Sequence, residues 1–211
     1  MKKQTFIQAT IILVIIGMIV KVLGLINRML IARLLTPEGI GVYMMVMPTF
    51  ILIIALAQLG FPISISKLVS ENNIKQEISN KTIVLKALKI SVINSSILII
   101  VLLLSAQYLS HSLLNDPRTY YPLLMLLIFI PLVSFTSILK GYLHGYKIIA
   151  TPSYSQLIEQ IVRITTSVAL VIILLPYGVE IAVSGAIIAI SLGEASALIY
   201  MIYKIKNKRS W

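Results

Sequence analysis

Residues 17–35 read GMIVKVLGLINRMLIARLL. Nearly all of these side chains suit lipid, and about 20 consecutive apolar residues are enough to cross a hydrocarbon core about 30 Å thick. Lys21 and Arg28 nevertheless lie inside the stretch. Ionisable residues within a membrane span are costly and commonly face a bundle interior or a water-filled cavity. The stretch therefore predicts a first membrane helix that has one polar face.

The rest of the chain has the same apolar character. Of its 211 residues, 58% are hydrophobic and only 12% are charged. A soluble domain needs more polar surface than this composition supplies. The net charge of +11 would ordinarily suggest a nucleic-acid partner. Here the basic residues follow the pattern of membrane loops instead, so no nucleic-acid partner is expected.

The apolar runs predict an all-α polytopic membrane protein in which residues 1–211 form a single six-helix bundle. The expected spans are about 5–35, 41–66, 83–109, 121–143, 154–175 and 181–203, with a cytoplasmic loop at 67–82. Backbone polar groups in lipid must bond within their own segment, which favours helices. The runs are continuous and do not alternate every second residue, which argues against an outer-membrane barrel.

The basic residues also predict the orientation. If the N-terminus is cytoplasmic, the segments on that side carry 13 Lys and Arg residues, and the opposite loops carry 2. Cytoplasmic loops are enriched in Lys and Arg. Both termini are therefore expected on the cytoplasmic side.

The polar residues of the first span share one face. Gly17, Lys21, Gly24 and Arg28 are offset by 4, 7 and 11 positions, which places them on one side of a helix. Two cations on that side suit a ligand with two negative groups, such as a diphosphate. Arginine binds a phosphate through two hydrogen bonds, and lysine acts as a point charge. The alternative is structural, with either cation paired to Glu194 to hold helices together.

Later spans carry a second set of polar residues, which are Gln156, Glu159, Gln160, Arg163 and Glu194. The first four lie within two helical turns of one another and form a stripe. The first, fifth and sixth spans could therefore enclose a polar groove. Its carboxyl groups could take up protons and so couple transport to an ion gradient. Alternatively, Glu159 and Arg163 could simply pair, because they are four residues apart on one helix.

The sequence offers little for catalysis. It has no cysteine, no P-loop, no Gly-x-Ser-x-Gly motif, and no paired-histidine or acidic ligand cluster. We therefore expect no enzyme activity, no cofactor and no metal site.

Three stretches carry a resemblance to a known family. They are KVLGLINRMLIARLLTPEGIGVY (21–43), GFPISISKLVSE (60–71) and LKGYLHGYKIIATPSYSQLIEQIVRI (139–164). They resemble the stage V sporulation protein B group, polysaccharide-biosynthesis members of the multidrug/oligosaccharidyl-lipid/polysaccharide exporter superfamily. The resemblance extends over essentially the whole chain, in order.

This resemblance implies the N-lobe, one six-helix bundle, of a MATE-like transporter in the bacterial cytoplasmic membrane. Such a protein would move lipid-linked peptidoglycan or polysaccharide precursors by alternating access. Related lipid II flippases hold the lipid diphosphate with first-helix cations, which implies substrate binding by Lys21 and Arg28. Asn27 matches the position of an arginine in those flippases, so it joins the implied site.

The implied partners follow from the same family. They are the lipid-linked saccharide, membrane lipids, and a missing C-terminal half or second copy, because these transporters have two bundles. Two other interpretations stay open. One is half of a multidrug or cation exporter, although its site should be rich in acids. The other is a non-transporting scaffold of a cell-wall synthesis complex.

Overall fold

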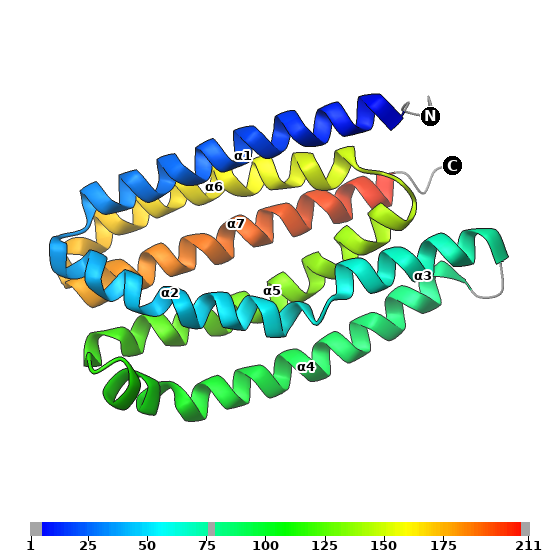
Figure 1. Cartoon of the computed structure of the whole chain (residues 1–211). Helices are drawn as coiled ribbons and strands as arrows, with labels where there is room; N and C mark the ends of the chain where they lie inside the picture. Colours follow the sequence, from blue (N-terminus) through cyan, green and yellow to red (C-terminus); the bar gives the residue numbers. More distant parts are fainter. Residues whose placement is uncertain (1–5, 76–78, 208–211) are drawn as a thin grey trace.

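The computed structural model describes residues 6–75 and 79–207, and every regular element in them is helical (Figure 1). The long helices are α1 (Phe6–Leu34), α2 (Pro37–Gln58), α3 (Phe61–Lys75), α4 (Asn80–Tyr108), α5 (Tyr120–Gly145), α6 (Ala150–Leu174) and α7 (Val179–Asn207). Short π or 3-10 turns are η1 (Leu109–Leu113), η2 (Pro117–Thr119) and η3 (Leu175–Tyr177). Within the described residues, 6 segments are long and apolar enough to cross a membrane. The all-α class and the six spans are thereby confirmed.

The second span is divided into two helices. Leu59 and Gly60 both have positive φ angles, 45° and 68°, so α2 ends there and α3 starts at Phe61. Pro62 fits in the first turn of α3, where its missing N–H is not needed. The two helices together form the apolar segment Pro37–Ile74.

The helices extend beyond the boundaries that hydropathy predicts. The segment 67–82, expected as a loop, is helical in its described residues except for Ser79, because α3 continues to Lys75 and α4 begins at Asn80; residues 76–78 lie outside the described part of the chain. An apolar run marks the part of a helix that suits lipid. Polar turns continue the same helix where the backbone is no longer surrounded by hydrocarbon.

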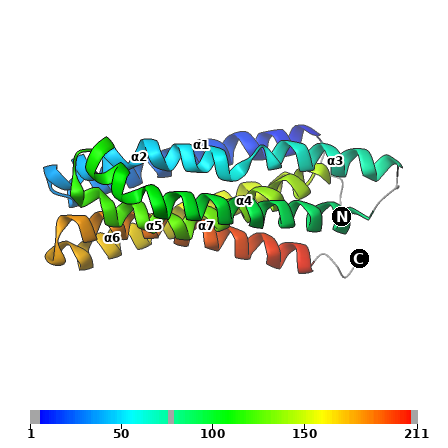
Figure 2. The ribbon, with the colours of Figure 1, turned by 90° about the horizontal axis from the view of Figure 1, so that it is seen from below.

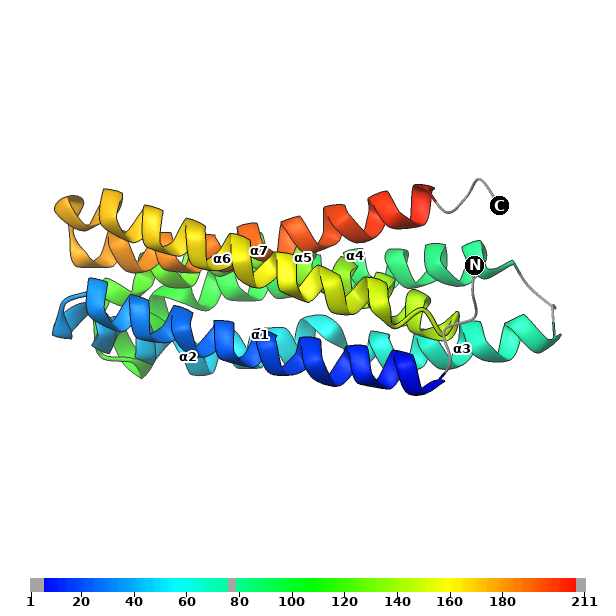
Figure 3. The same ribbon diagram turned by 90° about the horizontal axis from the view of Figure 1, so that it is seen from above.

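Helices α5 and α7 form the centre of the bundle. In the most apolar part of α7, 67% of the residues are buried, against 11% for α1. The core includes the fully buried Leu126 and Ile130 of α5 and Ile187 of α7. Helix α5 lies between α2 and α7, as Figures 2 and 3 show. Helix α1 is peripheral and packs mainly along α6.

The ends of the helices divide into two groups. Figure 1 shows the start of α1, the end of α7, the end of α3 and the start of α4 at one end of the bundle. The α1–α2, α4–α5 and α6–α7 connections lie at the other end. Six successive crossings of a membrane require this alternation, in which connections lie in turn at the two ends of the bundle. The membrane side that each end faces stays a prediction.

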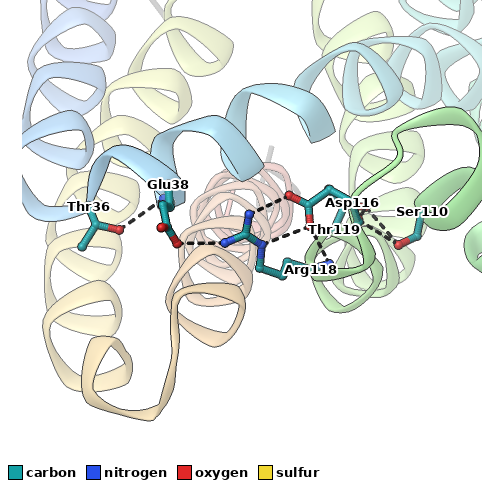
Figure 4. A network of polar contacts seen from close by, with 7 residues as sticks. Thr36, Glu38, Ser110, Asp116, Arg118 and Thr119 are labelled. Carbon is teal, nitrogen blue, oxygen red and sulfur yellow. Dashed lines mark hydrogen bonds and ion pairs between the residues drawn. The ribbon is translucent and has the colours of Figure 1, made fainter.

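One group of hydrogen bonds, which we call the Arg118 clasp, ties two connections together (Figure 4). Arg118 Nη1 lies 2.9 Å from Glu38 Oε2 at the start of α2, and Arg118 Nη2 lies 3.1 Å from Asp116 Oδ2. Asp116 also accepts a hydrogen bond from the Arg118 backbone N–H. The Arg118 side chain, through its hydrogen bonds, holds the pKa of Asp116 below its ordinary value.

A second group, the Asn80 clasp, lies at the opposite end. Asn80 Nδ2 donates to Asn73 Oδ1 at 2.7 Å and to the Tyr146 hydroxyl at 2.6 Å. Asn72 Nδ2 donates to Asn80 Oδ1 at 2.5 Å. The tip between α3 and α4 is thereby held to the residue that follows α5.

Candidate functional site

The inner face of α1 contacts α6 through small and polar residues. Ser167 Oγ donates a hydrogen bond of 2.7 Å to Asn27 Oδ1, and both side chains are buried. One turn earlier, a Cβ added at Gly24 would lie 4.0 Å from Gln160 Oε1. Asn27 therefore belongs to the contact between α1 and α6.

Lys21 and Arg28 are exposed on the same helix. The Arg28 guanidinium reaches toward α2, where its Nη2 lies 3.9 Å from Met44 Sδ. Among the described residues, neither Lys21 nor Arg28 forms an ion pair with a carboxylate. The structure therefore separates the three predicted ligand residues. Asn27 is buried against α6, whereas Lys21 and Arg28 are exposed.

Between α5, α6 and α7 lies what we call the buried charge cluster, which consists of two buried acids, Glu159 and Glu194, and two partly buried cations, Lys140 and Arg163. Arg163 donates to the Glu159 carboxylate, so the i,i+4 pair predicted on α6 is confirmed. Lys140 Nζ lies 3.8 Å from Glu194 Oε1. Glu194 thus pairs with Lys140, and its suggested pairing with Lys21 or Arg28 is wrong.

A close approach of α6 and α7 brings the two carboxylates into one site. A Cβ added at Gly193 would lie 2.9 Å from the Glu159 carbonyl oxygen and 3.2 Å from Arg163 Cβ. No residue larger than glycine fits there unless the helices separate. Glu194, the next residue on α7, is consequently held within electrostatic range of Glu159.

Several polar atoms in this region have no hydrogen-bond partner within the described part of the chain. They are buried and include Gln160 Oε1, Arg163 Nε and Glu194 Oε1. A buried polar atom left without a partner costs about 1–3 kcal/mol. Such atoms commonly mark a hydrated or functional site. Gln156 is half-buried one turn before Gln160 and extends the polar stripe of α6.

The two sites lie at a similar depth in the bundle. Helices α1 and α6 run in the same direction, since Gly24 faces Gln160 and Asn27 faces Ser167. Lys21 is therefore near the level of the buried charge cluster, with α6 lying between α1 and α7. The expected groove enclosed by the first, fifth and sixth spans is replaced by successive contacts, α1 on α6 and α6 on α7.

Two residues of this region were not predicted as site residues. Lys140 is one of the 13 basic residues assigned to the cytoplasmic side, although it lies inside the expected span 121–143. Its place within an apolar run was the signal that could have identified it. Tyr43 of α2 lies within electrostatic range of both Arg28 and Arg163. No spacing in the sequence connects these three residues.

Within residues 6–75 and 79–207, no three His, Asp or Glu side chains come together as a metal site would require.

Comparison with known proteins gives a consistent set of matches. Residues 6–210 match a family model described as polysaccharide biosynthesis protein. Stage V sporulation protein B of Bacillus subtilis (strain 168) is 38% identical over 100% of this chain and 41% of its own length. Sporulation protein YkvU of the same organism is 30% identical over 75% of this chain and 34% of its own length.

A third match is more distant. Lipid II flippase MurJ of Bacillus subtilis (strain 168) is 25% identical over 96% of this chain and 39% of its own length. The chain therefore spans less than half the length of these relatives. No solved structure matches the chain significantly.

Proposed function

Because the chain belongs to the polysaccharide biosynthesis protein family, we propose that it acts as the N-terminal half of a flippase for lipid-linked saccharides. The similarity to stage V sporulation protein B and to lipid II flippase MurJ supports this assignment. The substrates would be precursors of peptidoglycan or of another polysaccharide, moved across the bacterial cytoplasmic membrane. The other half of the transporter would be a C-terminal bundle or a second copy.

The exposed cations of α1 are the observation that carries the proposal. Lys21 and Arg28 lie inside the apolar segment Ile11–Leu34, and the described residues offer neither of them an ion pair. The buried carboxylates at the same depth, Glu159 and Glu194, already pair with Arg163 and Lys140. Cations within a membrane helix need a counter-charge. The diphosphate of a lipid-linked saccharide would supply it.

Binding would follow ordinary phosphate chemistry. Arg28 would donate two parallel hydrogen bonds to one phosphate, and Lys21 would attract the other as a mobile point charge. The two residues are separated by about 10 Å along the helix axis, a distance that their long side chains can bridge from both ends. Asn27 would act indirectly, because its bond to Ser167 holds α1 against α6.

Transport would proceed by alternating access, in which this bundle rocks against a second one. The buried charge cluster is proposed as the coupling element. A proton on Glu194 would remove its attraction to Lys140 and leave a partly buried cation without its ion-pair partner. The free energy of that change would favour a different arrangement of α5 and α7. Gln156 and Gln160 would supply the polar lining through which a proton reaches the cluster.

Binding of a polyprenyl diphosphate to the purified chain in detergent tests the proposed site. The variant Lys21→Ala/Arg28→Ala should bind at least about 100-fold more weakly, because each of the two lost charged contacts contributes about 1.5–3 kcal/mol. Arg33→Ala is the matched control, since Arg33 is an exposed cation near the end of the same helix. Polyprenyl monophosphate should bind more weakly than the diphosphate. Equal binding by the double variant and the wild type would refute the site.

The same assay separates the alternatives. A cation exporter would bind a cationic dye and ignore the diphosphate. A scaffold would bind neither ligand and would co-purify with a cell-wall synthase. The paired state of both buried carboxylates disfavours the exporter, because no buried acid in the described part of the chain is left unpaired to hold a cationic drug.

A further inference from the structure

Helix α3 packs closely on α5, and this contact determines which of its faces is left open. A Cβ added at Gly145 would lie 2.6 Å from Val69 Cβ, and one at Gly141 would lie 2.9 Å from the Pro62 carbonyl oxygen. Phe61, Ile65 and Val69 are the buried residues of this face of α3. Helix α3 is therefore held against α5, and the same apolar stripe also meets Ala87 of α4.

A groove of about 420 Å³ lies between α3 and α4. Its walls include Ser64, Leu68 and Glu71 from α3, and Ile83, Lys86 and Ile90 from α4. This volume is within the usual range for small-molecule sites, about 300–1,000 Å³. The groove is separate from α1 and from the buried charge cluster.

The polarity of the groove changes along its length. One end lies near the start of α3 and is lined by residues such as Phe61 and Ile90. The other end, toward the end of α3 and the start of α4, carries Glu71, and Lys86 lies one helical turn further in than Ile83. An apolar channel with charges at one end has the polarity of a phospholipid, which joins an acyl chain to a charged headgroup.

The charged end lies at the depth of the headgroups. The apolar segment Pro37–Ile74 has 38 residues in two successive helices, whose rise adds up to about 57 Å. A hydrocarbon core is only about 30 Å thick. The last turns of α3 and the first turns of α4 therefore extend past the hydrocarbon, toward the interface.

The charge around this end is positive. The exposed lysines near the tip are Lys67, Lys81, Lys86 and Lys89, and the neighbouring acid Glu71 lies 3.9 Å from Lys67. Lys86 lines the groove and forms no ion pair among the described residues. Clusters of basic residues at the end of membrane helices attract anionic lipid headgroups.

We propose that the groove between α3 and α4 binds an anionic phospholipid. One acyl chain lies between Leu68 and Ile90, and the phosphate contacts the Lys86 ammonium. The bound lipid fills the space that the α3–α5 contact leaves open. This site does not depend on the flippase function, because it uses none of the residues of α1, α6 or α7.

Native mass spectrometry of the purified chain in detergent, titrated with lipids of identical acyl chains, tests the proposal. Dioleoyl phosphatidylglycerol should bind about fivefold more tightly than dioleoyl phosphatidylcholine, in line with one basic contact. Lys86→Gln should remove this preference. Ser64→Trp, which fills the groove from an exposed position on α3, should weaken binding of both lipids.

Lys206→Gln is the matched control, because Lys206 is an exposed lysine on the last turn of α7. It should leave the preference unchanged. Circular dichroism of each variant establishes that the helices are intact. Equal binding of the two lipids by the wild type, or an unchanged preference in Lys86→Gln, would overturn the proposal. Preferred binding of dioleoyl phosphatidylethanolamine would overturn the headgroup assignment.

Discussion

Asn27 and Arg28 are adjacent in the sequence and have opposite surroundings. Asn27 is buried in the contact with α6, whereas Arg28 is exposed and reaches toward Met44 of α2. Successive residues of a helix point about 100° apart, so one step is enough to leave a helix contact. Asn27 therefore fits a structural role, and Arg28 fits the proposed ligand role.

Asn27→Ala should lower the stability of the bundle by about 1 kcal/mol, since it removes the interhelical hydrogen bond to Ser167. A double-mutant cycle with Ser167→Ala, measured by thermal unfolding in detergent, isolates the bond from the other effects of each change. A positive coupling energy is expected. If the two changes are simply additive, the hydrogen bond contributes nothing.

Asp116 should make the stability depend on pH in the acid range. Its pKa is lowered in the folded state by the Arg118 side chain. The stabilisation is therefore complete above the ordinary aspartate pKa of about 3.9 and is lost as the pH falls through the lower folded value. Wild type and Asp116→Asn should differ in unfolding temperature by a constant amount from about pH 5 to 7. The difference should shrink below about pH 4, and a constant difference there would contradict the assignment.

Only some ion pairs can be predicted from the sequence. The Glu159–Arg163 pair follows from a spacing of four residues on one helix. The Lys140–Glu194 pair depends on how α5 packs on α7, and no local spacing encodes that contact. The pairing of Lys140 with Glu194 could not be predicted for this reason.

At the scale of the elements, hydropathy identifies the spans but not the ends of the helices. Leu59 and Gly60 interrupt the second span within an otherwise apolar run. The Gly60-Phe61-Pro62 sequence marks the place, yet glycine and proline also occur inside membrane helices. Pro48 is an example, because α2 continues through it.

Gly145→Ala should destabilise the contact between α3 and α5 by about 1–3 kcal/mol, because its Cβ would overlap Val69. Gly41→Ala is the control, since Gly41 lies within α2 with no atom within 4 Å of its added Cβ. The control should be neutral or stabilise by up to about 1 kcal/mol. Thermal unfolding of both variants in detergent measures the difference. Shifts of the same sign and size would mean that the close approach has no energetic importance.

At the scale of the whole molecule, the sequence predicts how many helices there are but not which ones are neighbours. Most helices here are apolar on nearly all sides, as lipid requires, so the apolar pattern says little about which face meets which helix. Polar and small residues carry that information, and Asn27 does so for α1. The lateral position of α6 between α1 and α7 could not be derived from these few residues.

The orientation can be tested with single cysteines, because the chain has none of its own. Lys81→Cys and Lys206→Cys lie at the end of the bundle where α1 and α4 start and α7 ends, and Ser112→Cys lies at the other end (Figure 1). The distribution of Lys and Arg predicts that the first end is cytoplasmic. In intact cells, a membrane-impermeant maleimide should label only the Ser112→Cys variant. Labelling of the Lys81→Cys or Lys206→Cys variant before permeabilisation would contradict the predicted orientation.

The two clasps have a mechanical consequence for the bundle. The Arg118 clasp joins the α2 start to the α4–α5 connection, and the Asn80 clasp joins the α3–α4 tip to the end of α5. Sliding of α2 or α3 along α5 would have to break polar contacts at one end or the other. The two clasps therefore oppose sliding of α2 and α3 along α5 from the two ends of the bundle.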